Sequence, residues 1–261
     1  MSEDSSAPLL ITEGTTAIVT LRRPAHANRL QQEDVFQLRS CWDRLRQGTT
    51  IRAVVLTSTG RYFSAGYDIN SMPDISRSDH DGEVVENAFA SMVDELEQLP
   101  QVTICALNGG VYGGATDLAL ACDFRYGVPA CQMFIPAARL GLQYYLSGLR
   151  RYASRLGVDN AKRLFLLAEK LDAEQMLAIG YLHRIIHPNE LLPQALQTAR
   201  QVEGLAPLAI SGMKAALNAI AKGCVDERAI RLAEARTLSS NDIREGLMAW
   251  RDKRSPLFAG A

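Results

Sequence analysis

The pattern of hydrophobic and polar positions divides the chain into two parts. Up to about residue 187, short apolar and β-branched runs alternate with segments whose apolar residues recur every three or four positions. Such alternation is typical of an α/β fold in which helices cover most of the sheet. The expected strands are residues 17–21, 53–57, 102–107 and 183–186, and the expected helices are residues 34–46 and 83–99.

After Pro188 the pattern is helical throughout. The expected helices there are residues 190–202, 207–221, 226–238 and 242–253. Their apolar faces are wider than a lone surface helix needs, and they pack either within the chain or against another subunit. We therefore divide the chain into a disordered N-terminus over residues 1–10, a core over residues 11–195 and an all-helical C-terminal region over residues 196–261.

Composition excludes several classes of protein. Hydrophobic residues make up 47% and charged residues 22% of the 261 residues, as in globular proteins. The net charge of -1, from 28 basic and 29 acidic residues, gives no basic excess for binding nucleic acid. No apolar run approaches the roughly 18 residues of a membrane helix. The five cysteines include no CxxC pair, which indicates reduced thiols and a cytoplasmic protein.

Two glycine-containing turns carry the candidate chemistry. Residues 108–117 contain four glycines between an expected strand and a helical run, and residues 61–69 hold Ser-Ala-Gly after another strand. Glycine lets a ligand approach the backbone closely, and the first N–H groups of a helix have no partner within it. Each turn alone is as well explained by tight packing. Two such turns that converge could form an oxyanion hole.

The two turns also resemble the signatures of a known family. Phe63-Ser-Ala-Gly-Tyr-Asp-Ile69 and Asn108-Gly-x-x-x-Gly-Gly-x-x-Asp-Leu-Ala-x-x-Cys-Asp123 are similar to the two signature stretches of the crotonase (enoyl-CoA hydratase/isomerase) superfamily. Further matches, at residues 21–24, 140–141 and 245–258, extend the resemblance over nearly the whole chain. It implies a spiral of ββα units, a C-terminal helical region that forms homotrimers or hexamers, an acyl-CoA thioester substrate, and neither a metal nor a tightly bound cofactor.

The resemblance also implies roles for individual positions. The backbone N–H groups of Tyr67 and Gly114 would hold the thioester carbonyl oxygen. Trp250 and Lys253, near the C-terminus, would reach the coenzyme A of a neighbouring subunit. Arg23 is a candidate contact for a phosphate of coenzyme A, although a solvated surface side chain is an equally good interpretation of this arginine. The positions expected to contact coenzyme A are Arg23, Ala65, Asp68, Ile69, Trp250 and Lys253.

The sequence departs from the hydratases of this superfamily at both catalytic glutamates. Asp117 stands at the first position and Ala137 at the second. A first-turn side chain leans back toward the helix N-terminus, so Asp117 is the candidate proton-transfer group, although compensation of the helix dipole also explains it. Tyr144 matches a tyrosine of the methylmalonyl-CoA decarboxylase branch and is the candidate orienting or proton-donating group; the alternative is that Tyr144 and Tyr145 only form a wall of the acyl pocket.

Three functions follow from these residues. Decarboxylation of a malonyl-type CoA and hydration of an enoyl-CoA with a variant acid/base set both need an enolate stabilised in an oxyanion hole. Both would make the protein a lyase. A non-catalytic acyl-CoA-binding or scaffolding subunit is the alternative, because the second glutamate is missing.

Overall fold

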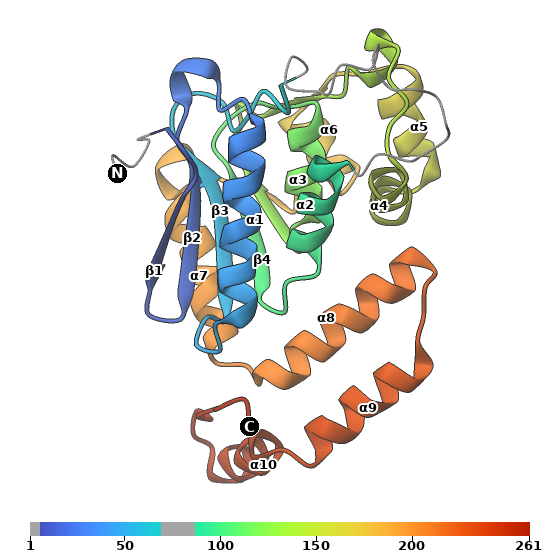
Figure 1. Cartoon of the computed structure of the whole chain (residues 1–261). Helices are drawn as coiled ribbons and strands as arrows, with labels where there is room; N and C mark the ends of the chain where they lie inside the picture. The colour runs from blue at the N-terminus through green and yellow to red at the C-terminus, as the bar shows by residue number, and fades with distance from the viewer. Residues whose placement is uncertain (1–5, 69–86) are drawn as a thin grey trace.

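A mostly parallel six-stranded sheet lies at the centre of the fold (Figure 1). The computed structural model describes residues 6–68 and 87–261. The strand order is β1-β2-β3-β4-β6-β9; only the β1–β2 pair is antiparallel. The strands are β1 (Leu9–Glu13), β2 (Thr16–Leu21), β3 (Ala53–Ser58), β4 (Val102–Leu107), β6 (Phe124–Gly127) and β9 (Arg184–Ile185).

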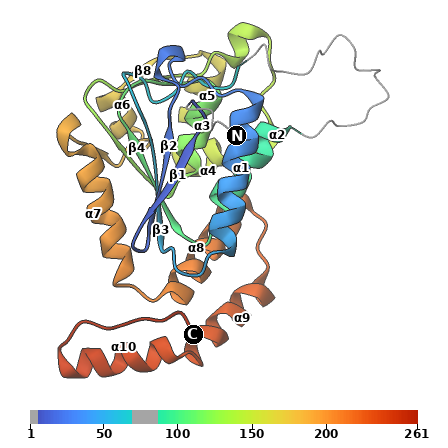
Figure 2. The same cartoon turned by 60° about the vertical axis from the view of Figure 1, so that its left-hand side comes forward.

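Helices cover both faces of this sheet. Helices α1 (Gln32–Gln47) and α2 (Ala88–Glu97) lie on one face, and α7 (Leu191–Glu203) lies on the other, against β3 and β4 (Figure 2). Every residue of β4 is buried, because a strand covered on both faces has no solvent side. This explains why the central strands are nearly continuous apolar runs in the sequence.

A small second sheet and four short helices complete the core. The sheet has the order β5-β7-β8, with β5 (Val111–Tyr112), β7 (Gln132–Phe134) and β8 (Leu171–Asp172). The helices are α3 (Gly114–Ala121), α4 (Leu146–Leu156), α5 (Val158–Leu166) and α6 (Ala173–Ala178). Asp172 and Gln175 form the capping box that starts α6, which fixes where this helix begins.

The last three helices form an arm that projects away from the sheet (Figure 1). They are α8 (Pro207–Lys222), α9 (Glu227–Leu238) and α10 (Asn241–Asp252). Neither α8 nor α9 contains a buried residue, although both carry large apolar side chains. The most exposed of these, Met213, Leu217, Leu232 and Leu238, are each 59 to 66% exposed and define what we call the apolar arm face.

The structure confirms the α/β class and the helical C-terminal region and corrects the predicted boundaries. The expected disordered N-terminus is wrong from Leu9 onward, because β1 pairs with β2; residues 1–5 lie outside the described residues. The boundary expected after residue 195 falls inside α7, so the core extends through Glu203. The helix expected over residues 83–99 begins at Ala88, and residues 83–86 are not described.

Within the described ranges, no single helix has the length and apolarity of a membrane span. The pair Pro188–Glu203 and Pro207–Lys222 passes that test only together, and it is bent by 112°.

Candidate active site

The two glycine turns meet in space, as the sequence predicts. Ser64 and Val111 form a parallel bridge, and Tyr112 N–H donates to the Ser64 carbonyl at 3.0 Å. Gly66 has a φ of 94°, and a Cβ atom there would lie 2.6 Å from the Tyr112 carbonyl oxygen and 3.2 Å from the Gly114 nitrogen. Only glycine permits so close an approach of the two backbones.

Hydrogen bonds on one side of Tyr67 set the direction of its N–H group. Leu30 N–H donates to the Gly66 carbonyl, and Asp68 N–H donates to the Leu30 carbonyl, both at 2.8 Å. In such a parallel bridge the central residue directs its own N–H to the opposite edge. Gly114 is the first residue of α3, where an N–H has no partner within the helix. Both predicted oxyanion donors therefore belong to residues that line one pocket.

This pocket has a volume of about 180 Å³ and is mainly apolar and aromatic. Tyr67 and Tyr145 both pack against Phe89, with ring centroids 5.4 and 6.3 Å from it. Ala137 lies in the wall at the position of the missing glutamate. Among the described residues that line the pocket, none carries a carboxylate, an amine or a guanidinium. The described walls therefore suit an uncharged acyl group.

Asp117 lies behind this wall, fully buried. Its Oδ2 atom accepts a hydrogen bond from the Tyr145 hydroxyl at 2.5 Å and pairs with Arg151 Nη1 at 2.5 Å. Its Oδ1 atom has no hydrogen-bond partner among the described residues. Burial raises the pKa of Asp117, and the Arg151 charge opposes this. The structure thus places Tyr145, and not the carboxylate itself, at the pocket surface.

A buried network of alternating charges holds this carboxylate. Arg151 also pairs with Asp94 at 2.5 Å and with Glu97 at 3.0 Å, and Glu97 pairs with Arg155 at 2.9 Å and with Lys222 of α8 at 2.7 Å. Burial alone would raise the pKa of Glu97, but the guanidinium groups outweigh it and lower the pKa to about 2. The network therefore joins the arm to the residue behind the pocket.

Tyr144 lines the same pocket. Its ring stacks on Tyr145 at a centroid distance of 4.6 Å and an interplanar angle of 18°. Its hydroxyl oxygen is buried near the Tyr145 and Thr116 side chains but makes no hydrogen bond of acceptable geometry in the described part of the chain. Burial, followed by the nearby Asp117 charge, raises the pKa of Tyr144 well above 10. The hydroxyl is therefore a protonated group with spare hydrogen-bonding capacity.

The positions expected to contact coenzyme A have different surroundings. Ala65 lines the pocket, and Asp68 pairs with Arg29 at 3.2 Å. The Arg23 guanidinium pairs with buried Asp34 at 3.1 Å and also donates to the Gln31 side chain. It is thus already engaged by an acidic partner, which weakens the case for a phosphate contact. Ile69 lies outside the described residues.

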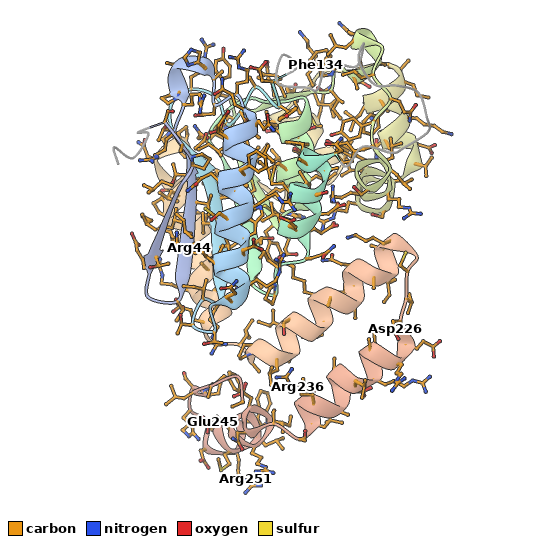
Figure 3. The ribbon with its side chains drawn as sticks, viewed as in Figure 1. Arg44, Phe134, Asp226, Arg236, Glu245 and Arg251 are labelled. Carbon is orange, nitrogen blue, oxygen red and sulfur yellow. The ribbon has the colours of Figure 1, made fainter. Side chains whose placement is uncertain are left out.

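Trp250 and Lys253, at the C-terminal end of α10, do not reach the pocket of their own chain. Figure 3 shows Phe134, whose carbonyl accepts from Gly113 N–H at 2.9 Å, at one end of the molecule and Arg251 of α10 at the other. Trp250 is 87% exposed. A contact between these tail positions and coenzyme A would therefore require a neighbouring subunit. Over residues 6–68 and 87–261, no group of three or more histidine, cysteine, aspartate or glutamate side chains is arranged to hold a metal ion.

The residues that surround Asp117 are not evident from the sequence. Tyr145 is predicted only as a pocket wall, and neither Arg151 nor Glu97 is predicted to take part. Asp94 and Glu97 are spaced three residues apart and thus share one helix face, which is a weak signal for a common cationic partner. The identity of that partner, 54 residues away from Glu97, is decided by the packing of α2 against α4.

Comparison with known proteins agrees with this geometry. The family model described as enoyl-CoA hydratase/isomerase matches residues 12–261. The chain is 30% identical to a carnitinyl-CoA dehydratase of Salmonella arizonae (96% of this chain, 97% of the relative) and 27% identical to a short-chain-enoyl-CoA hydratase of Clostridium acetobutylicum (94% and 95%). The structure of Pseudomonas aeruginosa DspI superposes with a TM-score of 0.87 at 29% identity, covering 98% of both chains. The chain therefore belongs to the enoyl-CoA hydratase/isomerase family and has its crotonase-type fold.

Proposed function

We propose that the protein is an acyl-CoA-processing enzyme that holds the thioester carbonyl oxygen between the N–H groups of Tyr67 and Gly114. The observation that carries this proposal is the meeting of the two turns at one apolar pocket. Negative charge develops on that oxygen when the α-carbon becomes an enolate, and each backbone donor typically lowers the barrier by about 3 to 4 kcal/mol.

Hydration of an enoyl-CoA, or the reverse loss of water, is the reaction that the site supports best. Two relatives bear the names of a hydratase and a dehydratase, so water chemistry on CoA thioesters occurs within the family. The uncharged described walls suit a neutral enoyl group. With Ala137 in place of the second glutamate, the acid/base set must be a variant one. The substrate is a CoA thioester, and no tightly bound cofactor is needed.

Decarboxylation of a malonyl-type CoA is the second candidate. It is favoured by the buried Tyr144 hydroxyl, which makes no hydrogen bond of acceptable geometry within the described chain and could donate to a substrate carboxylate. Loss of carbon dioxide also needs no base to form the enolate, which suits a pocket whose described lining has no carboxylate.

A panel assay separates these reactions. The purified protein is incubated with crotonyl-CoA and with methylmalonyl-CoA, while loss of the enoyl absorbance and release of carbon dioxide are followed. Hydration alone supports the first candidate, and carbon dioxide release alone supports the second. Tight binding of both thioesters without turnover would instead identify a non-catalytic acyl-CoA-binding subunit, for which the named relatives give no support.

We also propose that the protein is a homotrimer or a hexamer in the cytoplasm. The apolar arm face is too exposed for a stable monomer surface. Hollows of 420 and 550 Å³ between the arm and the core offer further surface for a neighbouring chain. In such an assembly, Trp250 and Lys253 could contact the coenzyme A bound by a neighbour.

A further inference from the structure

The carboxylate nearest the acyl pocket has no direct path into it. Asp117 is fully buried and does not line the pocket, whereas Tyr145 does, with its hydroxyl 2.5 Å from Asp117 Oδ2. A single hydrogen-bonded side chain therefore separates the carboxylate from the space where the acyl group would lie. This arrangement differs from the direct role predicted for Asp117.

We propose that Tyr145 is the group that exchanges protons with the acyl-CoA, and that Asp117 accepts the Tyr145 proton from behind the pocket wall. Arg151 acts as a positioning residue, because its contacts to Asp94, Glu97 and Asp117 fix the carboxylate that the Tyr145 hydroxyl faces. This inference rests on the proposed function and specifies how that site moves protons.

The proton balance closes with water as the only co-reactant. As the oxygen of water bonds to the β-carbon, one of its protons passes to the Tyr145 oxygen while the Tyr145 proton moves to Asp117 Oδ2. The C=C π electrons move to the thioester oxygen, giving an enolate. The α-carbon then takes a proton from Tyr145, which recovers its own from Asp117. The net change is addition of H and OH across the double bond.

Tyr145 is better placed for this role than its neighbour Tyr144. The two rings are stacked, but only the Tyr145 hydroxyl is hydrogen bonded to a carboxylate that can take up its proton. Burial and the Asp117 charge raise the pKa of Tyr145 well above 10, so the phenol stays protonated at neutral pH. Transfer must then be concerted, with one proton arriving as the other leaves.

Exchange of the α-protons of butyryl-CoA in D₂O, followed by NMR, tests this proposal. Butyryl-CoA has the thioester and α-carbon but no double bond, so only proton transfer is measured. We expect Tyr145→Phe to slow exchange by a factor of about 100 or more and to leave the Kd for butyryl-CoA unchanged. Tyr126→Phe is the matched control, because it removes a buried tyrosine hydroxyl that bonds Thr198 on the far side of the core, and its exchange rate should equal that of the wild type.

A second variant keeps the proposal testable if Tyr145→Phe does not fold. In the wild type, exchange should weaken as pH falls, because a protonated Asp117 cannot accept another proton. Asp117→Asn should be slow at every pH and lack this acid limb. The charged groups around Asp117 are Arg151 and Glu97, and the other titratable groups there are the buried phenols Tyr144, Tyr145, Tyr152 and Tyr181.

The outcomes distinguish the inference from the proposed function. A wild type that neither exchanges α-protons nor turns over a CoA thioester overturns both. A wild type that exchanges them while Tyr145→Phe exchanges equally fast, or an acid limb that persists in Asp117→Asn, overturns the Tyr145 role and leaves the proposed function standing.

Discussion

Replacing Glu97 by glutamine should destabilise the protein in a strongly pH-dependent way. The Glu97 carboxylate is 3% exposed and contacts three cations, Arg151, Arg155 and Lys222. Its pKa is lowered from 4.5 to about 2, which corresponds to about 3 kcal/mol in favour of the folded state at neutral pH. Glutamine keeps the shape but loses the charge, so the free energy of unfolding should fall by about this amount.

The sign of the pH dependence follows from the lowered pKa. The stabilisation is fully present above pH 4.5, where the unfolded carboxyl is also ionised, and it is lost as pH falls toward 2. Urea unfolding of wild type and Glu97→Gln, at one protein concentration and several pH values, measures the difference. It should be about 3 kcal/mol at pH 7 and should shrink steadily below pH 4.5.

A matched control is available on the surface. Glu169 pairs with the exposed Arg163 at 2.9 Å at the protein surface, where solvent screens the charges, so Glu169→Gln should change stability little at any pH. If Glu97→Gln were no more destabilising than Glu169→Gln at pH 7, or if its effect did not vary with pH, the account of the buried network would be refuted.

Three further predictions concern the turn, the cysteines and the arm. Gly66→Ala should reduce turnover and stability far more than Gly14→Ala, because both glycines have positive φ but only a Cβ at residue 66 would meet backbone, at 2.6 Å. Steady-state kinetics and urea unfolding of the two variants measure the difference. Equal effects would contradict the close contact of the two turns. Of the five cysteines only Cys224 is exposed, and burial raises the pKa of Cys131 to about 12, so iodoacetamide should modify residue 224 alone in the native protein, as read by mass spectrometry. Leu217→Glu should reduce the mass seen by sedimentation toward the 28.6 kDa monomer; an unchanged assembly would remove the apolar arm face from the interface.

The sequence by itself determined the α/β class, the central strands and the two turns. Strands β2, β3 and β4 are identifiable because burial on both faces favours nearly continuous apolar runs. The turns are identifiable because glycines mark where two backbones approach each other. Strand β1 escaped prediction because it lies at the sheet edge with half-exposed or exposed side chains, and so lacks a clear apolar run.

Only the tertiary structure decided what surrounds Asp117. The sequence places the Asp117 carboxylate in the first turn of α3. Whether the carboxylate faces the pocket depends on which side chain lies between the two. That side chain is Tyr145, which comes from a loop 28 residues further along the chain. The charges that hold it come from α2, α4 and α8. Spacing along one element fixes which side chains share a face, whereas ion-pair partners are chosen by the packing of separate elements, for which a single sequence carries no direct signal.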